Sequence, residues 1–395
     1  MPVVVYVLGL SIFGLGTTEF MIAGLLPLIA DDLGVSVPAV GGLISAFAIG
    51  MVIGAPVLTV ASLRLPRKTT LVAALGLFIA GQVLGALAPS YALLLVARVV
   101  TAVATGAFWG VAAVTAVRAV SPDRTARALS VLLGGLTVAN VVGVPAGTWI
   151  GQWLGWRATF WAVAVVALVS LVGVLAAVPR EARETTVPRL RDELRSFRSG
   201  RLWVALSTIV LYGGAIFGIF SYAAPLITDV AGAPASAVPA ILFLFGLGAF
   251  VGNVAGGRVA DRGILLNLHV SFTALLATMV ALGLAAGSAI AVVALLFTMG
   301  VTGYSAAAAL NGRVFLLAAA APTLASAVTT SAFNVGNTIG PWLGGAAISA
   351  GLGFRAPIWV GVALLLGALA LTFVSRAMDA SLRPEQQLRG APVGR

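Results

Sequence analysis

The sequence predicts an all-α integral membrane protein with twelve transmembrane helices in two pseudo-symmetric six-helix bundles. The first observation is composition: 60% of the 395 residues are hydrophobic, 9% are charged and the mean hydropathy is +1.10. A soluble chain would carry about 25% charged residues, so most of this chain must face lipid or other membrane-embedded helices. The other two observations are the spacing of the apolar segments and an internal repeat.

Charged or turn-rich breaks divide the chain into twelve apolar segments. Each is close to the roughly 20 residues that a helix needs to cross the hydrocarbon core. The predicted spans are 4–28, 38–62, 69–89, 91–117, 126–151, 157–178, 203–228, 236–259, 265–287, 289–312, 324–350 and 354–376. The first lacks a basic flank and is too long for a secretory signal, so we interpret it as a span.

A long polar stretch between the sixth and seventh spans divides the chain into halves. We expect an N-terminal bundle at 1–178, a cytoplasmic linker at 179–202, a C-terminal bundle at 203–376 and a cytoplasmic tail at 377–395. In the linker, Leu190, Leu194 and Phe197 recur at a helical spacing among charged residues. This pattern fits a helix lying on the membrane surface, and it fits a solvated connection equally well.

The basic residues predict the orientation. If both termini are inside, the inner loops and the tail hold all of the 23 Lys and Arg residues except Arg98, Arg157 and Arg355. Because basic residues concentrate in cytoplasmic loops, we expect cytoplasmic termini and a location in a bacterial inner membrane. Their distribution in short stretches between spans also argues against nucleic-acid binding, despite a net charge of +11.

The two halves match each other at a constant offset of 198 residues. The pairs are Gly16 with Gly214, Pro27 with Pro225, Asp31 with Asp229, Gly50 with Gly248, Gly54 with Gly252, Arg64 with Arg262 and Gly147 with Gly345. "GWRATFW" from Gly155 likewise matches "GFRAPIW" from Gly353. Since each half has an even number of spans, the copies run in the same direction and should be related by an axis along the membrane normal, as in transporters.

Several other classes of protein are disfavoured. The absence of Cys and the single His, His269, leave no thiolate or histidine-built metal centre, and we expect no metal and no cofactor. An enzyme would need a nucleophile–base pair or a metal cluster within the spans, and one His with one buried Glu cannot supply either. A channel would need a ring of like groups, and ATP-driven transport would need a phosphate-binding loop that is missing here. These observations disfavour an enzyme, a channel and an ATP-driven pump.

Two stretches, Gly16 to Val57 and Val141 to Val163, carry a closer resemblance. They read "GTTEFMIAGLLPLIADDLGVSVPAVGGLISAFAIGMVIGAPV" and "VVGVPAGTWIGQWLGWRATFWAV". The chain resembles the twelve-span drug–proton antiporters of the major facilitator superfamily, and within them the actinobacterial chloramphenicol exporters. Sugar-efflux and nucleoside-efflux relatives share much of both stretches. The resemblance implies the major facilitator fold.

Glu19 is the one acidic residue that we place deep inside an apolar span. An unpaired carboxylate there is costly when ionised, so we expect it to be protonated for much of the time. A group whose charge changes with its access to water can couple proton movement to a conformational change. The alternative is a hydrogen bond to a neighbouring helix with a packing role only.

Arg98 is the only basic residue placed inside a span. The family's fourth-span motif has an Arg at this position, and the resemblance implies a role in proton coupling. A buried guanidinium stabilises a nearby ionised carboxylate in one conformation and releases it in another. The alternative is an arginine near the outer end that reaches out to water. Ala102 replaces the glycine that the motif has four residues later.

The fifth span, "GGLTVANVVGVPAGTWIG", resembles the antiporter motif of that span. It retains Gly135, Gly143, Pro145 and Gly147, with Val144 separating Gly143 from Pro145. Small residues let two helices approach closely, and a proline bends a helix, so this run could seal the transport pathway in one state. Ordinary small-residue packing is the alternative. The eleventh span carries the repeat partner, "NVGNTIGPWLGG".

The loop after the second span matches the family's gating pattern in part. Arg64, Arg67 and Lys68 fit, whereas Thr59, Leu63 and Pro66 replace its Gly, Asp and second Gly. The second copy keeps Gly257, Asp261 and Arg262. The acidic part of the pattern is therefore intact only in the C-terminal half. Anchoring by positive charges at the cytoplasmic side explains the basic residues equally well.

The leading hypothesis is proton-coupled efflux of a small neutral or amphipathic drug of the chloramphenicol kind, by a monomer with alternating access. Export of a sugar, nucleoside or other metabolite is the alternative. The candidates for the substrate cavity lie on spans that line it in this family: Phe20, Phe108, Trp109, Asn140, Phe220, Tyr222, Asn334 and Asn337. Aromatic and amide side chains with little charge would suit such a molecule.

Overall fold

Every regular element in the computed structural model is a helix, within the residues that the structure describes: 1–62, 65–179, 199–318 and 322–380. The first half contains α1 (Val3–Phe20), α2 (Ile22–Leu33), α3 (Val37–Ser62), α4 (Arg67–Ala86), α5 (Tyr91–Arg118), η1 (Pro122–Arg124), α6 (Thr125–Val138), η2 (Ala139–Gly143), α7 (Val144–Leu154) and α8 (Trp156–Ala177). The second contains α10 (Gly200–Ser221), α11 (Ala223–Pro225), η4 (Leu226–Val230), η5 (Ala235–Ala237), α12 (Val238–Ala260), α13 (Ile264–Ala285), α14 (Ala289–Tyr304), α15 (Ala307–Leu317), α16 (Pro322–Ala347), η6 (Ile348–Leu352) and α17 (Ala356–Ala380).

These helices account for the predicted spans. Among the described residues, 11 segments are long and apolar enough to cross a membrane. The remaining prediction, 324–350, corresponds to the more polar α16 and the following η6. Beyond the predicted end of the first span at residue 28, the helix α2 continues through two aspartates to Leu33, and Gly34 ends it in a left-handed conformation. The all-α class predicted from composition is confirmed.

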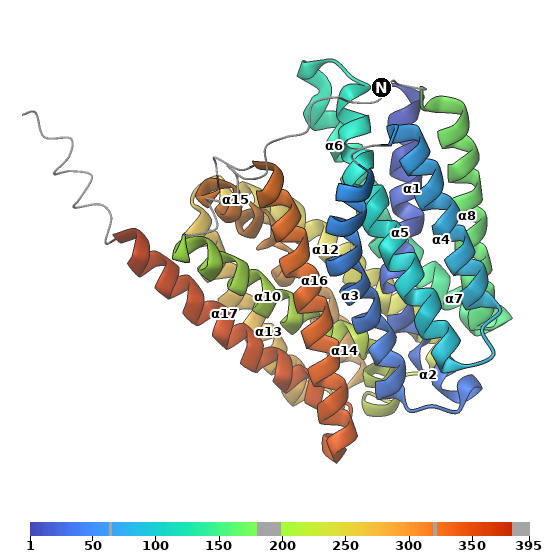
Figure 1. Ribbon diagram of the computed structural model, residues 1–395. Helices are drawn as coiled ribbons and strands as arrows, with labels where there is room; N and C mark the ends of the chain where they lie inside the picture. The colour runs from blue at the N-terminus through green and yellow to red at the C-terminus, as the bar shows by residue number, and fades with distance from the viewer. Residues whose placement is uncertain (63–64, 180–198, 319–321, 381–395) are drawn as a thin grey trace, which may run out of the picture.

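The two halves lie beside each other, blue to green on the right of Figure 1 and yellow-green to red mainly on the left. Helix α1 begins and α17 ends at the same end of the bundle. We call this the proximal end and the opposite one the distal end. The linker residues Leu190, Leu194 and Phe197, for which a surface helix was one prediction, lie outside the described residues.

Equivalent glycines make equivalent helix contacts in the two halves. A Cβ at Gly50 on α3 would lie 2.7 Å from the Cβ of Ala102 on α5. Its repeat partner Gly248, on α12, packs in the same way against the backbone of Phe297 on α14. Gly54 and Gly252 continue the two contacts one turn later. The absence of a side chain lets each pair of helices approach closely at the same place in its half.

The turns repeat as well. Gly34 and Gly232, which are 198 residues apart, have φ angles of 62° and 69°. Gly155 and Gly353, at the same offset, have φ angles of 83° and 72°. Glycine adopts this region without the steric cost that a Cβ imposes. The offset seen in the sequence is therefore also an offset in backbone conformation.

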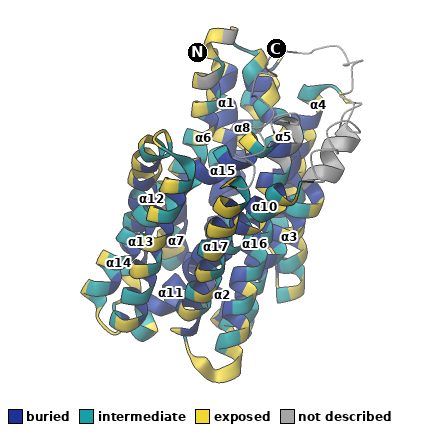
Figure 2. Cartoon of the chain, turned by 90° about the vertical axis from the view of Figure 1, so that its left-hand side faces the viewer, coloured by how far each residue is buried: buried dark blue, intermediate teal, exposed yellow. Residues whose placement is uncertain are grey.

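Large apolar side chains remain exposed on the outer faces of the bundle. Figure 2 shows the exposed residues in yellow along the outer helices. On α8, Val165, Leu168, Val172 and Leu175 are each at least half exposed and recur at a helical spacing. A soluble protein rarely exposes an apolar stripe of this kind, whereas lipid covers it at no cost. The outer faces are therefore suited to the bilayer.

Most contacts between the halves join α3 with α16, α7 and η2 with α12, and α2 with α11, and α2 also contacts α10 and α12. Ser45 Oγ on α3 donates a hydrogen bond to the carbonyl oxygen of Thr338 on α16, at 3.0 Å. Near the distal end, Gln152 Nε2 donates to the carbonyl oxygen of Ala235, at 2.7 Å. These contacts join the halves at mid-depth and on the distal side.

Candidate functional site

Glu19 lies where the first span is interrupted. Helix α1 ends at Phe20, Met21 forms a turn, and α2 begins at Ile22. The Glu19 side chain is half-buried and forms no hydrogen bond or ion pair with the described residues. It interacts electrostatically with Arg98 of its own half and Tyr304 of the other. The carboxylate therefore lies between the halves without a direct partner.

Arg98 projects from α5 onto the end of α1 and is fully buried. Its Nη1 donates a hydrogen bond to the carbonyl oxygen of Thr18 at 2.7 Å, and Nη2 donates to that of Glu19 at 3.3 Å. Carbonyls in the last turn of a helix lack intrahelical partners, so the guanidinium caps α1. The centre of the guanidinium also lies 4.3 Å from the ring centroid of Phe47, in a cation–π contact.

Gln82 is part of the same site, and the sequence analysis missed it. From α4, its Nε2 donates to Thr18 Oγ1 at 2.5 Å, while its Oε1 has no partner among the described residues. The signal was present, because Gln82 is a polar amide within an otherwise apolar span. The end of α1 is thus held by two side chains. Gln82 of α4 binds the side chain of Thr18, and Arg98 of α5 binds backbone carbonyls.

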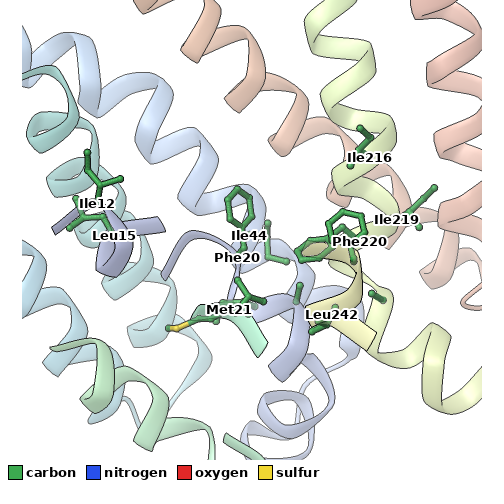
Figure 3. Close-up of a cluster of buried hydrophobic side chains, with 14 of the residues drawn as sticks. Ile12, Leu15, Phe20, Met21, Ile44, Ile216, Ile219, Phe220 and Leu242 are labelled. Carbon is green, nitrogen blue, oxygen red and sulfur yellow. The ribbon is translucent and has the colours of Figure 1, made fainter. Parts of the chain in front are cut away.

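A cluster of aromatic rings follows Glu19 directly. Phe20 stacks on Phe217 of α10 with centroids 5.0 Å apart, and it meets Phe220 edge-on at 6.3 Å. Phe220 in turn lies 4.7 Å from Phe245 of α12, which meets Tyr304 at 6.2 Å. Figure 3 shows Phe20 beside Ile44 and directed toward Phe220, with Leu242 below them. The cluster joins the two halves next to the carboxylate.

Tyr222 bridges the halves closer to the distal end. It follows α10, is buried, and donates a hydrogen bond from its hydroxyl to the carbonyl oxygen of Pro341 at 2.9 Å. The hydroxyl lies so close to Gly41 on α3 and Gly345 on α16 that a Cβ at either position would overlap it. Tyr222 is therefore a packing element of the interface in this conformation, rather than part of an accessible lining.

The other substrate-cavity candidates differ in exposure. Phe108 is fully buried, whereas Trp109 is half-buried beside Phe47. Asn140 is half-buried in the π-helical turn η2, and its Nδ2 donates to the carbonyl oxygen of Leu136.

Two amides on α16 have unmet hydrogen-bonding capacity. Asn334 and Asn337 are buried, and the Oδ1 atom of each has no partner among the described residues. The Nδ2 of Asn334 donates to the carbonyl oxygen of Thr330 at 3.0 Å. An unpaired buried acceptor costs about 1–3 kcal/mol, so these two oxygens are available to a polar ligand or to water.

The glycine run of the fifth span packs against the first span. A Cβ at Gly135 would overlap the carbonyl oxygen of Gly9, and one at Gly143 would overlap Thr17 Oγ1. Pro145 and Gly147 are buried on α7, and Gly147 faces Thr159 of α8. Since these contacts lie within the first half, the run fixes α1 against α6, η2 and α7.

The predicted gating loops are only partly described. Arg64 lies outside the described residues, and Arg67 is the first residue of α4. Lys68 Nζ donates to the carbonyl oxygens of Leu175 and Val178, at 2.6 and 2.7 Å, and so caps the end of α8. Asp261 and Arg262 are exposed at the proximal end of α12 and form no ion pair with the described residues. The described residues as a whole contain no group of three or more His, Cys, Asp or Glu side chains that could hold a metal ion.

Comparisons with known proteins agree with this architecture. The family model of the Major Facilitator Superfamily matches residues 8–330. The chain is 40% identical to a chloramphenicol resistance protein of Streptomyces lividans, over 98% of this chain and 100% of that one. It is 37% identical to the inner membrane transport protein YdhP of Escherichia coli K12, over 93% of this chain and 94% of that protein.

A solved structure gives the same fold at lower identity. The crystal structure of a bacterial homologue of the human lysosomal transporter Spinster, in an inward-facing and unoccupied conformation, superposes with a TM-score of 0.71. The match covers 95% of this chain and 97% of that one, at 19% sequence identity. At this identity the match shows a shared fold.

Proposed function

We propose that this chain, which belongs to the Major Facilitator Superfamily, uses proton entry to drive export of a small neutral or amphipathic drug resembling chloramphenicol. The family and the relatives are membrane transporters rather than enzymes, so the chain is a multi-pass transporter of small molecules. The coupling ion and the substrate are the parts that we propose. The first rests on Glu19 and the second on similarity to the chloramphenicol resistance protein.

The observation that carries proton coupling is the state of the Glu19 carboxylate. It retains some accessible surface, lies at the junction of the halves and has no ion-pair partner among the described residues. An ionised carboxylate in a low-dielectric interior is unfavourable unless it is paired, and binding a proton removes the charge. The described hydrogen bonds of Arg98 to α1 both go to the backbone, so its guanidinium does not pair with the carboxylate. We propose that the carboxylate gains and loses a proton during transport.

The position of Glu19 connects its charge to the contact between halves. The next residue, Phe20, stacks on Phe217 of the other half. A change in the charge of Glu19 alters the hydration and position of this turn, and with it the aromatic contact. In the cycle we propose, drug binds from the proximal side while Glu19 is ionised, and a proton from the distal side drives release there.

The present conformation corresponds to the state closed on the distal side. The support is the location of the contacts between halves: Phe20 and Gln152 engage the second half, and Tyr222 engages α3 of the first, all at mid-depth or distally. A relative of the same fold adopts an inward-facing conformation. We therefore propose that the proximal end faces the cytoplasm of a bacterial cell and that the monomer is the transporting unit.

Accumulation of labelled chloramphenicol tests the proposal in cells expressing wild type, Glu19→Gln or Asp123→Asn, each with and without a protonophore. Asp123 is an exposed acid far from the site, so its variant controls for the loss of one negative charge. We expect wild type and the control to exclude the drug, and both Glu19→Gln and the protonophore to abolish exclusion. Exclusion that survives in Glu19→Gln but not with the protonophore would place the proton site elsewhere.

Export of a sugar, nucleoside or other metabolite is the second candidate. It is favoured by the 37% identity to a transport protein whose name specifies no drug. If wild-type cells accumulate as much chloramphenicol as cells without the protein, this candidate replaces the first.

A further inference from the structure

We propose that a hollow at the proximal end of the second half, between α13 and α17, binds the headgroup of an anionic phospholipid. The hollow has a volume of about 580 Å³. It is lined by Leu265, Leu266, His269, Arg376, Asp379 and Ala380. This volume is within the range of roughly 300–1,000 Å³ that small-molecule sites occupy. The inference rests on the membrane location of the chain and is independent of the exported substrate.

The charge around the hollow is positive. Asp379 is already engaged by two guanidinium groups, because Arg313 Nη2 donates to its Oδ1 at 2.7 Å and Arg201 forms an ion pair with the same oxygen. Arg313 also donates to Ser375 Oγ at 2.9 Å, which fixes it in the core of the bundle. Arg313, which is buried, and Arg201, which is half-buried, therefore more than neutralise the one carboxylate that faces the hollow.

Arg376 provides the free positive group. It is exposed on α17, lines the hollow, and forms no hydrogen bond or ion pair with the described residues. Arginine presents several N–H donors in a planar fork that matches the oxygens of a phosphate. With Arg201, Arg313 and Asp379, it gives the site a net charge of about +2, since arginine is always protonated.

The rest of the lining is apolar and faces outward. Leu266 is 57% exposed on α13, and Phe373, one turn before Arg376 on α17, is 54% exposed. The ring of Phe373 meets His269 edge-on, with centroids 4.5 Å apart. His269 Nδ1 lies 2.6 Å from the carbonyl oxygen of Leu265, so this nitrogen carries the hydrogen and donates. Helices α13 and α17 thus present exposed apolar side chains next to the guanidinium of Arg376.

This combination fits a phospholipid better than a free anion. A basic pocket between helices at the membrane boundary attracts acidic headgroups, while an adjoining apolar wall accommodates acyl chains. Charge does not favour the C-terminal tail as the occupant, because residues 381–395 contain three arginines and one glutamate. The occupant we propose is a phosphodiester with an uncompensated negative charge, such as phosphatidylglycerol in the leaflet at the proximal end.

The test is a titration of purified protein in neutral detergent with dioleoyl phosphatidylglycerol, followed by native mass spectrometry. Wild type is compared with Arg376→Gln, Arg376→Lys and the control Arg124→Gln. Arg124 is an exposed arginine at the proximal end of the first half, so its variant removes the same charge away from the hollow. Dioleoyl phosphatidylcholine and inorganic phosphate serve as comparison ligands.

We expect the first phosphatidylglycerol to bind about tenfold more weakly to Arg376→Gln, since one charge-assisted contact is lost. Arg376→Lys should keep most of the affinity, Arg124→Gln should match wild type, and phosphatidylcholine should not discriminate among the four proteins. Equal binding to wild type and Arg376→Gln, or an equal loss in Arg124→Gln, would overturn the proposal. Displacement of the lipid by an equal concentration of phosphate would instead make the ligand a free phosphoryl anion.

Discussion

The guanidinium of Arg98 binds the main chain of Glu19: its Nη2 donates to the Glu19 carbonyl oxygen at 3.3 Å, and no ion pair joins it to the Glu19 carboxylate in the described residues. The buried arginine of α5 and the carboxylate at the end of α1 are thus neighbours whose charges are not directly paired. This arrangement separates two roles. Arg98 holds the backbone at the break in the first span, and the carboxylate stays free to gain or lose a proton.

The first prediction concerns the geometry of Arg98. Arg98→Lys keeps the charge, but an ammonium group cannot reproduce the planar fork that spans the carbonyls of Thr18 and Glu19. We expect drug efflux to fall by at least about tenfold and stability to fall by about 1.5–3 kcal/mol, the value of one hydrogen bond to a charged group. Transport assays in vesicles and thermal unfolding in detergent measure the two effects. Wild-type transport in the lysine variant would show that charge alone is sufficient.

The second prediction compares two adjacent glycines on α6. A Cβ at Gly135 would overlap the backbone of Gly9, whereas one at Gly134 meets nothing within 4 Å. Gly135→Ala should therefore destabilise the protein by about 1–3 kcal/mol through overpacking. Gly134→Ala should be neutral or stabilising by up to about 1 kcal/mol, since alanine favours a helix. Thermal unfolding of both variants in one detergent decides the matter, and similar behaviour of the two would refute the close contact.

The third prediction concerns the contact between Gly41 and Tyr222. Gly41→Val should prevent Tyr222 from seating between α3 and α16, and so shift the population toward a state that is open distally. Because the chain has no native cysteine, Ile44→Cys is a unique label site. We expect faster maleimide labelling of this buried position in Gly41→Val than in the Ile44→Cys parent.

Gly76→Val is the matched control for that experiment, because nothing lies within 4 Å of the Cβ position at Gly76. Adding Tyr222→Ala to Gly41→Val should restore slow labelling by removing the obstructing ring. If the two glycine variants are labelled at the same rate, the interface does not depend on this contact.

The fourth prediction is a pH dependence at the distal surface. Asp32 Oδ2 accepts hydrogen bonds from Arg157 Nη1 at 2.5 Å and Trp156 Nε1 at 3.1 Å. The bond from Arg157, with a smaller contribution from Trp156, lowers the pKa of Asp32 below its usual 3.8 despite partial desolvation. A lowered pKa in the folded state contributes stability above the unfolded value, and this is lost as the pH falls through the folded value.

Asp32→Asn should accordingly be less stable than wild type at pH 7, by at most about 1 kcal/mol because the pair is well exposed. The difference should diminish below pH 3.8. Denaturant unfolding of both proteins at pH 7 and pH 3 tests this. A difference that is unchanged between the two pH values would show that the carboxylate's charge is not responsible.

Much of the fold followed from the sequence because the bilayer imposes a simple rule. Apolar segments of about 20 residues must become helices when no water is available to the backbone. The repeat was equally readable, since glycines such as Gly155 and Gly353 perform the same steric task in each half. The sites of interruption were not predicted. Met21 and Tyr222 interrupt spans at positions that no turn residue marks, and Arg98, which binds the backbone at the first interruption, comes from a distant helix.

The candidate site was predictable only in part, for the same reason. Glu19 and Arg98 were identifiable as charged residues in apolar surroundings. Extending the search to polar residues in apolar surroundings would have identified Gln82 as well. Their partners were not identifiable, because Arg98 bonds to backbone carbonyls that are identical in every residue. Tyr222 was expected to line the substrate pathway, yet it packs between glycines, which is a tertiary relationship that no local pattern encodes.

The capping of α1 by Arg98 also has a consequence for biosynthesis. The two bonded residues, Glu19 and Arg98, are 79 positions apart. At a synthesis rate of about 5–20 residues per second, Arg98 leaves the ribosome on the order of ten seconds after Glu19. Throughout that interval the nascent first span must wait in the translocon or bilayer with two uncapped carbonyls and an unshielded acid. The first span can therefore be capped only after the fourth span has been inserted.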